Sequence, residues 1–176
     1  MRLSTHPLRT ALSLLGMLLF AAAARGADLP EYRLKAAFLY NFAVYTEWPA
    51  EVGNKLNLCV LGQDPFDGEL QQLSGKVIGT RSIAVQNMTT RKSITDCQLL
   101  YIAPSAIGEL PLVLGALNGL RVLVVTDSPG AARDGAAINM AVQNSKILFE
   151  VNLKAVQDAR LTLSSKLLRL AREIYP

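Results

Sequence analysis

The stretch of sequence that decides the fold is Tyr32-Arg-Leu-Lys-Ala-Ala-Phe-Leu-Tyr-Asn-Phe-Ala-Val-Tyr-Thr-Glu-Trp-Pro49. Its apolar residues recur at helical spacing, which predicts one amphipathic helix of about four turns. The apolar face of that helix is expected to consist of Leu34, Phe38, Phe42 and Tyr45. Because proline disfavours helical backbone in the residue before it, the helix should end at Trp48-Pro49. The apolar run at residues 56–62 then predicts a buried strand.

Two further apolar runs, at residues 98–103 and 121–126, are each followed, like the run at 56–62, by a turn that contains proline. Runs that are apolar on both faces are typical of parallel strands covered by helices on both sides. We also expect a shorter edge strand at residues 81–88 and a helix at residues 106–117. This order of elements predicts a largely parallel sheet.

The end of the chain follows a different pattern. Residues 135–143 and 146–152 are strand-like and are separated by Asn144-Ser145, which predicts an antiparallel hairpin. A short helix is expected at residues 153–158, and Ser164 or Ser165 should cap a final helix. The apolar face of that last helix would comprise Leu167, Leu170, Ala171 and Ile174. Together these elements predict a single-domain, three-layer α/β sandwich over residues 27–176, with a mixed, largely parallel sheet and a C-terminal β-hairpin at one edge.

Residues 1–26 have the features of a secretory signal peptide. Arg2 and Arg9 form a basic start, an apolar run covers residues 11–24, and Ala24-Arg-Gly26 is a small-x-small cleavage site. The apolar run is shorter than the roughly 20 residues that a transmembrane helix needs. We therefore expect a protein that is cleaved near Gly26, exported to the periplasm and not embedded in a membrane.

The charge of the chain does not favour nucleic acid as a partner. The whole sequence has 18 Lys and Arg against 14 Asp and Glu. Three of the basic residues lie in the predicted signal peptide, which leaves 15 against 14 and a net charge of +1. Binding to nucleic acid or to an anionic membrane usually needs a clear excess of basic residues. We expect no nucleic-acid partner.

Histidine chemistry is missing from residues 27–176, because the only histidine of the chain is His6. Nucleophile activation by histidine, general base catalysis by imidazole and the commonest zinc ligand are therefore excluded from that part of the chain. We expect no catalytic residues, no metal site and no cofactor, and we predict that the protein is not an enzyme.

The two cysteines, Cys59 and Cys97, would lie in an oxidising compartment after export. A disulfide between them is then the expected state, and two buried free thiols are the alternative.

Two aspartates follow predicted parallel strands. Asp64 comes after the run at 56–62 and Asp127 after the run at 121–126. Open α/β sheets bind ligands at the carboxyl ends of their strands, so these carboxylates are candidates for a small ligand crevice. Aspartates in turns and helix caps are the more common alternative. Asp64 followed by Pro65 also has the pattern of a cap and first turn for the next helix.

The second hairpin strand contains Phe149-Glu-Val-Asn152, in which apolar and polar residues alternate. If Phe149 and Val151 face the core, Glu150 and Asn152 face outwards. An exposed hairpin at a sheet edge can meet a protein partner, so Glu150 and Asn152 are candidate partner-binding residues. A solvated strand face is the alternative.

The sequence from Tyr32 to about Arg172 resembles the YfiR-like family of periplasmic proteins. The resemblance is carried by short motifs distributed along the chain, which are Ala36-Ala-Phe-Leu-Tyr-Asn-Phe42, Glu47-Trp-Pro49, Cys59-Val-Leu-Gly62, Asp64-Pro-Phe66, Gly79-Thr-Arg81, Cys97, Val124-Val-Thr-Asp127, Phe149-Glu-Val-Asn152 and Leu161-Thr-Leu-Ser-Ser-Lys-Leu-Leu-Arg-Leu-Ala171.

This resemblance implies a regulatory protein. YfiR-like proteins bind the periplasmic sensor domain of an inner-membrane diguanylate cyclase and repress cyclic di-GMP synthesis. Their release, often through an OmpA-like lipoprotein of the outer membrane, raises cyclic di-GMP and favours biofilm. A homodimer is left open. The alternative function is a periplasmic receptor domain that binds a small molecule in its strand-end crevice.

Overall fold

The computed structural model describes residues 28–176, so the predicted signal peptide at residues 1–26 lies outside the described part of the chain. Its centre is an eight-stranded sheet in the order β10-β8-β7-β6-β5-β2-β4-β3. The strands are β2 (Lys55–Leu61), β3 (Val77–Ile78), β4 (Arg81–Met88), β5 (Leu99–Ile102), β6 (Leu123–Thr126), β7 (Ile138–Gln143), β8 (Lys146–Asn152) and β10 (Glu173–Tyr175). A separate two-stranded sheet pairs β1 (Thr46–Glu47) with β9 (Thr162–Leu163).

Most of the central sheet is parallel, as the sequence predicts. Strands β4, β2, β5, β6 and β7 run in one direction, and β10 runs parallel to β8. Antiparallel pairing occurs between β7 and β8, and between β3 and β4. The mixed sheet with its hairpin confirms the predicted fold class.

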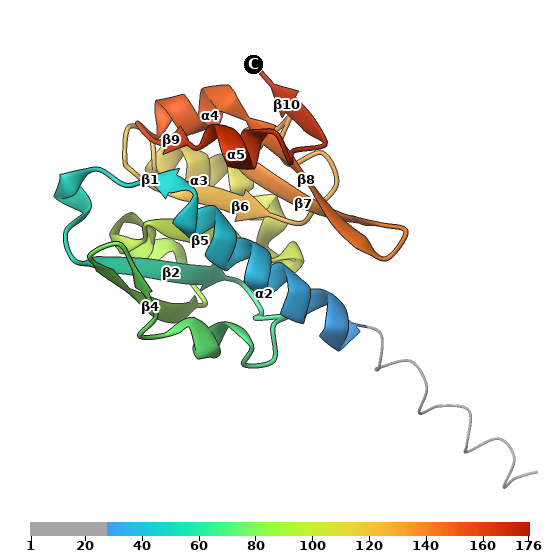
Figure 1. Cartoon of the computed structure of the whole chain (residues 1–176), viewed down its shortest axis with the longest axis horizontal. Helices are drawn as coiled ribbons and strands as arrows, with labels where there is room; N and C mark the ends of the chain where they lie inside the picture. The colour runs from blue at the N-terminus through green and yellow to red at the C-terminus, as the bar shows by residue number, and fades with distance from the viewer. Residues whose placement is uncertain (1–27) are drawn as a thin grey trace, which may run out of the picture.

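Helices cover both faces of this sheet (Figure 1). On one face lie α2 (Asp28–Val44), α4 (Leu153–Asp158), α5 (Ser165–Leu168) and the 3-10 turn η2 (Leu70–Leu73). On the other face lie α3 (Leu110–Ala116) and the 3-10 turns η3 (Arg91–Asp96) and η4 (Pro104–Glu109). A further 3-10 turn, η1 (Ala50–Val52), follows β1.

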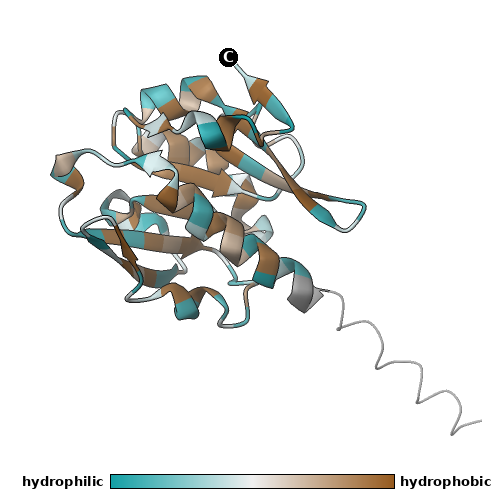
Figure 2. Cartoon of the chain, in the orientation of Figure 1, coloured by the Kyte–Doolittle hydropathy of each residue, from teal (hydrophilic) through white to brown (hydrophobic). Residues whose placement is uncertain are grey.

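Two hydrophobic clusters separate the layers, and the central strands contribute to both. Along β5, Leu99 and Tyr101 belong to the cluster under α2, while Leu100 and Ile102 belong to the cluster under α3. Successive side chains of a strand point to opposite faces, so a strand buried on both sides must be apolar throughout. The apolar colour of the central strands is visible in Figure 2.

Helix α2 ends at Val44, four residues before the predicted end at Trp48. The residues after it pair with β9 instead, with Thr46 opposite Leu163. Two side chains satisfy backbone carbonyl groups in the last turn of the helix. Thr46 Oγ1 donates to Phe42 O at 2.6 Å, and Trp48 Nε1 donates to Ala43 O at 2.8 Å. A tertiary strand pairing therefore ends the helix before the proline does.

The predicted apolar face of α2 is also wrong in part. Leu34 is 43% exposed, and Phe38 and Tyr45 are only half-buried. The buried residues of the helix are Lys35, Ala36, Leu39, Phe42 and Ala43. The helix carries apolar residues all round, so helical spacing alone does not single out the face that meets the sheet.

No α-helix follows Asp64, so its predicted role as a helix cap is wrong. Asp64 Oδ1 accepts a hydrogen bond from Phe66 N at 2.8 Å, which closes a local turn. Asp67 and Gly68 then adopt φ values of 48° and 83°. Such values lie outside the right-handed helical region, and only the short turn η2 forms after them.

The predicted hairpin is confirmed, and so is the helix α4 that follows it. Asn144 and Ser145 connect the strands with φ values of 50° and 58°. Two consecutive positive φ values are those of a type I′ turn, whose twist matches that of paired strands.

The final helix is much shorter than the sequence predicts. Ser164 caps it, with Ser164 Oγ accepting from Leu167 N, but α5 ends at Leu168. Leu170 is 69% exposed, and Ile174 lies in β10 rather than on a helical face. The chain leaves the helix because β10 pairs with the free side of β8, so the sheet ends in β10 and not in the hairpin.

Candidate functional site

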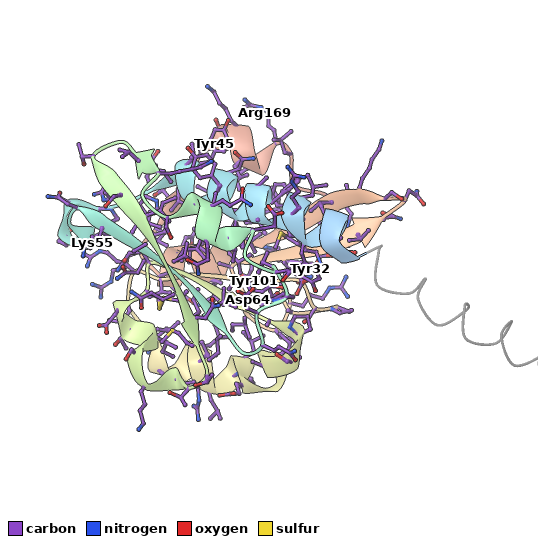
Figure 3. The ribbon with its side chains drawn as sticks, turned by 90° about the horizontal axis from the view of Figure 1, so that it is seen from below. Tyr32, Tyr45, Lys55, Asp64, Tyr101 and Arg169 are labelled. Atoms are coloured by element: carbon purple, nitrogen blue, oxygen red, sulfur yellow. A yellow bond between two sulfur atoms is a disulfide. The ribbon has the colours of Figure 1, made fainter. Side chains whose placement is uncertain are left out.

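The two candidate ligand aspartates lie at the same edge of the sheet. Asp127 follows the carboxyl end of β6 and Asp64 follows that of β2, while β5 lies between these strands. Tyr101, on β5, therefore stands between the two aspartates. Asp64, Tyr101 and Tyr32 are labelled near one another in Figure 3, and Phe66 contacts the rings of both tyrosines.

Asp127 is buried and paired with a lysine from α2. Its side chain is 1% exposed, and Asp127 Oδ2 lies 2.6 Å from Lys35 Nζ, whose side chain is 4% exposed. Lys35 also forms an ion pair with Glu31, one helical turn earlier, and its ammonium lies 4.3 Å from the centre of the Tyr32 ring. We call Glu31, Tyr32, Lys35 and Asp127 the Lys35 cluster. The side chains of this cluster occupy the space beyond the carboxyl end of β6.

Three groups in and beside the Lys35 cluster, Tyr32, Lys35 and Tyr101, have raised pKa values. Burial acts to lower the pKa of Lys35, but hydrogen bonds to Asp127 and Glu31, together with the charge of Asp127, outweigh it and raise that pKa. Burial, followed by the charge of Asp127, raises the pKa of both Tyr32 and Tyr101. Lys35 is therefore cationic and the two tyrosines are neutral under physiological conditions.

Asp64 is also engaged within the protein. Besides its bond from Phe66 N, Asp64 Oδ2 accepts from Asn87 Nδ2 at 2.8 Å. Aromatic edge contacts fill the space beside it, with ring centres 5.4 Å apart for Tyr32 and Phe66 and 4.9 Å apart for Phe66 and Tyr101. A ligand-binding role for Asp64 and Asp127 stays a prediction.

Lys35 is the site residue that reasoning from the sequence missed. A signal for it was present, because Glu31 and Lys35 have the i,i+4 spacing of a helical ion pair. Lys35 is also the one charged residue within the otherwise uncharged run from Leu34 to Thr46. A lone lysine in an apolar helix indicates either an exposed position or a buried anion, and here the anion is Asp127.

The predicted partner-binding residues are not on an exposed strand face. Glu150 is only 7% exposed and forms an ion pair with Arg172, because β10 covers this side of β8. Asn152 is half-buried and accepts from Ala155 N at 2.8 Å, which caps α4. The expectation that both side chains face solvent is therefore wrong. Their part in partner binding stays a prediction.

Glu150 belongs to a row of buried polar side chains that crosses three strands. Thr126 Oγ1 on β6 donates to Asn139 Oδ1 on β7 at 2.7 Å, and Asn139 Nδ2 donates to Glu150 Oε2 on β8 at 3.4 Å. Arg172, just before β10, then pairs with Glu150. This polar row links the middle of the sheet to the C-terminal strand.

A groove of about 360 Å³ lies at the other end of β6, near its amino end, between the carboxyl end of α3 and α4. Its floor includes the apolar side chains of Leu117 and Val124. Its rim carries both signs of charge, among them Asp134, Lys154 and Asp158. Reasoning from the sequence did not predict this groove, because its lining comes from three separate segments of the chain.

Cys59 and Cys97 form a disulfide, which is the pairing that the sequence predicts. Both residues are buried in the cluster under α3, at exposed fractions of 0% and 1%. The bond ties the middle of β2 to the segment just before β5.

Two features are absent from residues 28–176. No group of three or more His, Cys, Asp and Glu side chains in this part of the chain is placed to hold a metal ion. Its helices are all too short or too polar to cross a membrane.

Comparison with known proteins identifies a family and a fold. A sequence model of the YfiR/HmsC-like family matches residues 32–172. A search of curated proteins gave no match. The ABC domain in complex with L-Trp from Streptococcus pneumonia is a similar solved structure, with a TM-score of 0.55 and 7% sequence identity. A conserved domain protein from Vibrio cholerae O1 biovar El Tor has a TM-score of 0.49 and 8% identity. Each comparison covers 81% of this chain and 60% of the other, and the first shows a shared α/β fold.

Proposed function

The chain belongs to the YfiR/HmsC-like family, and from this membership we propose that it is a periplasmic regulator of an inner-membrane diguanylate cyclase. In this proposal the protein binds the sensor domain of the cyclase outside the inner membrane and represses cyclic di-GMP synthesis inside the cell. The match to the family over residues 32–172 is the observation that carries the proposal.

In this proposal, binding of the regulator is coupled to the equilibrium between the active and inactive states of the cyclase. A protein that binds the inactive state of the cyclase more tightly than the active state shifts the enzyme towards the inactive state. The size of the shift is limited by the difference between the two affinities. An OmpA-like lipoprotein of the outer membrane that competes for the same protein would relieve the repression.

The strand-end site supports a regulatory rather than a catalytic role, because its ionisable side chains are already engaged within the protein. Asp127 is neutralised by Lys35, and Asp64 is engaged by Phe66 N and Asn87. The raised pKa values of Lys35 and Tyr101 leave these groups without proton-transfer activity near neutral pH. The disulfide between Cys59 and Cys97 supports an oxidising compartment such as the periplasm.

We place the contact with the cyclase on the C-terminal edge of the sheet, at β10, which pairs with β8 beside Glu150 and Asn152. Among residues 28–176 no strand pairs with the outer side of β10, and such edges accept strands of other proteins. Ile174 on β10 is 41% exposed, and Leu170 before it is 69% exposed. These apolar side chains, rather than the buried Glu150, are available to a partner.

Capture from membranes tests this proposal. The purified protein would serve as bait for detergent-solubilised membranes of its own organism, and bound proteins would be identified by mass spectrometry. We expect a diguanylate cyclase with a periplasmic domain, and we expect Leu170→Glu/Ile174→Glu bait to lose it. Leu112→Glu is a matched control, because Leu112 is 58% exposed on α3, on the other face of the sheet. Failure of the unaltered bait to enrich any cyclase over the control resin would contradict the proposal.

A small-molecule receptor is the second candidate function, and the groove between α3 and α4 favours it. Its volume of about 360 Å³ lies within the usual range of small-molecule sites, roughly 300–1,000 Å³. Native mass spectrometry of gently purified protein would reveal a retained ligand. Ala155→Trp, which fills the groove, should abolish that ligand if the groove is the site. Unliganded protein in every preparation would count against this candidate.

A further inference from the structure

The central sheet has a second free edge at β4, at the end opposite β10 (Figure 1). Strand β4 is eight residues long, and the two-residue strand β3 pairs only with its beginning, at Arg81 and Ser82. Beyond that point, from Ala84 to Met88, no strand among residues 28–176 pairs with the outer side of β4. Most of this strand therefore has a partner on one side only.

The backbone hydrogen bonds show which residues of β4 face β2. Ser82 N donates to Asn54 O at 3.0 Å at the start of the strand. Met88 O accepts from Gly62 N at 3.0 Å at its end. Because the direction of the backbone groups alternates along a strand, the even-numbered residues of β4 bond to the β2 side.

The odd-numbered residues of β4 direct their backbone groups outwards. Ile83 bonds there to the segment before β3, donating to Lys76 O at 2.8 Å and accepting from Gly75 N at 2.9 Å. Val85 and Asn87 follow in the same orientation, and no described strand pairs with them on that side. Val85 is half-buried and Asn87 is exposed. The N–H and C=O groups of both residues are available to an incoming strand.

This edge lacks the features that usually prevent strand pairing. Proteins protect free edges with charged side chains, prolines, bulges or very short strands. From Ser82 to Thr90 the chain has neither a charged residue nor a proline. Strand β10, at the other edge, has only three residues, includes Glu173 and is followed directly by Pro176. Strand β4 therefore offers the longer unprotected edge for the addition of an extended segment of another protein.

Lysines stand at both ends of this uncharged edge. Lys76 lies on its outer side next to Ile83, and Lys92 follows the end of β4. Both lysines are exposed, and neither forms an ion pair within residues 28–176. Two copies of the chain joined edge to edge would bring lysines together at both ends, in either orientation. A segment with acidic residues at its two ends is complementary instead.

Two acidic side chains near this edge are already engaged within the protein. Asp64 Oδ2 accepts from Asn87 Nδ2 at 2.8 Å, and Glu109 pairs with Arg91 at 2.8 Å. They therefore leave the charges of Lys76 and Lys92 available to a partner.

We infer that the outer edge of β4 accepts an extended, uncharged segment of another protein as an added strand, with acidic residues at both ends of that segment. The backbone of the segment pairs with Val85 and Asn87, and its acids meet Lys76 and Lys92. Because β4 and β10 are at opposite ends of the sheet, this inference does not depend on the proposed contact with a cyclase.

Fluorescence anisotropy with the labelled peptide Asp-Asp-Thr-Val-Thr-Val-Thr-Asp-Asp tests the strand addition. The protein should bind this peptide. Binding should weaken at least about tenfold when lysines replace the aspartates, or when alternate amides of the peptide are methylated. Lys76→Glu/Lys92→Glu should reverse the preference between the two charged peptides. No binding of the acidic peptide at about 1 mM, or equal binding of all three peptides, would overturn the inference.

Hydrogen exchange followed by NMR locates the added strand. In the free protein, the amides of Val85 and Asn87 should exchange faster than those of Ala84 and Gln86, which bond to β2. The acidic peptide should slow exchange at Val85 and Asn87 at least about tenfold. Protection of β10 amides in their place, or of no amide in β4, would overturn the inference.

Val85→Pro removes one outward N–H and leaves the bonds to β2 in place, and proline is tolerated at such edge positions. If it folds, as judged by circular dichroism, it should bind the acidic peptide at least about tenfold more weakly. Leu170→Glu/Ile174→Glu is the matched control at the other edge and should bind the peptide normally. Val85→Pro should still capture the cyclase, so the two proposals can fail separately. Unchanged peptide binding by folded Val85→Pro would overturn the inference, and hydrogen exchange of the unaltered protein decides it if the variant does not fold.

Discussion

Lys35 Nζ lies 2.6 Å from Asp127 Oδ2, and this contact joins the first turns of α2 to the end of β6. The two residues are 92 positions apart in the sequence. Both side chains are almost fully buried, so each charge depends on the other for its stabilisation in a medium of low dielectric constant. Two oppositely charged side chains of the protein therefore occupy the end of the sheet at which α/β proteins usually bind ligands.

The first prediction concerns this ion pair. Lys35→Met should lower the free energy of unfolding by about 3–5 kcal/mol, because it leaves the Asp127 carboxylate buried without a cation. Lys35→Met/Asp127→Leu should recover most of that loss, since it removes both charges. Urea unfolding followed by circular dichroism gives these values.

Lys154 provides a matched control for that prediction. Lys154 Nζ and Asp158 Oδ2 are also 2.6 Å apart, but their side chains are 71% and 58% exposed. Lys154→Met should therefore cost less than about 0.5 kcal/mol. Equal losses for Lys35→Met and Lys154→Met would contradict the role that we give to burial.

The second prediction concerns alkaline pH. The pKa values of Lys35 and Tyr101 are raised in the folded protein, so the folded state holds these protons more tightly than the unfolded state. Stability from both groups is then complete below their unfolded pKa values, near 10, and decreases as the pH rises further. Tyr101→Phe should reduce the slope of stability against pH above about pH 10 by up to 1.4 kcal/mol per pH unit.

Urea midpoints measured from neutral pH to about pH 11 test this slope. Tyr101→Phe should be close to neutral at pH 7, since the Tyr101 hydroxyl is buried without a hydrogen-bond partner among the described residues. An identical alkaline slope in the variant and the unaltered protein would show that Tyr101 titrates normally.

The third prediction concerns the disulfide. It closes a loop with a sequence separation of 38 between Cys59 and Cys97. Chain-entropy reasoning assigns such a loop up to about 4 kcal/mol. Reduction with dithiothreitol should lower the free energy of unfolding by up to that amount, which is measured as a lower urea midpoint. A Cys59→Ala/Cys97→Ala protein should be less stable and insensitive to dithiothreitol, and a midpoint unaffected by reduction of the native bond would refute the assignment.

The fourth prediction concerns Glu150, which the sequence alone places on the surface. Glu150→Lys should destabilise the protein by about 3 kcal/mol or more, because it replaces the buried acid that pairs with Arg172 by a buried cation. Glu51→Lys, at a side chain that is 64% exposed, should cost less than about 0.5 kcal/mol. Hydrogen exchange should also show faster exchange of the β10 amides in Glu150→Lys, and unchanged protection there would argue against the polar row as an anchor of β10.

The elements that were predicted correctly are those whose signals are local. Strands β2, β5 and β6 are apolar on both faces, and Asn144-Ser145 carries the turn chemistry of a hairpin. The bounds of α4 agree with the sequence, because Asn152 provides a local cap.

The elements that were missed depend on contacts between distant segments. Val44 ends α2 because the next residues pair with β9, more than 100 positions later. Residues 173–175 leave the predicted helix because β8 offers them a free strand edge. The same pairing buries Glu150. Because the sequence did not predict β10, it wrongly placed Glu150 on an exposed strand face.

Cellular cyclic di-GMP in a strain that lacks this gene tests the central claim most directly. Deletion should raise cyclic di-GMP, and complementation with the unaltered gene should restore the low level. Leu170→Glu/Ile174→Glu, if folded and exported as well as Leu112→Glu, should fail to restore it. An unchanged level of cyclic di-GMP after deletion would contradict repression of a cyclase by this protein.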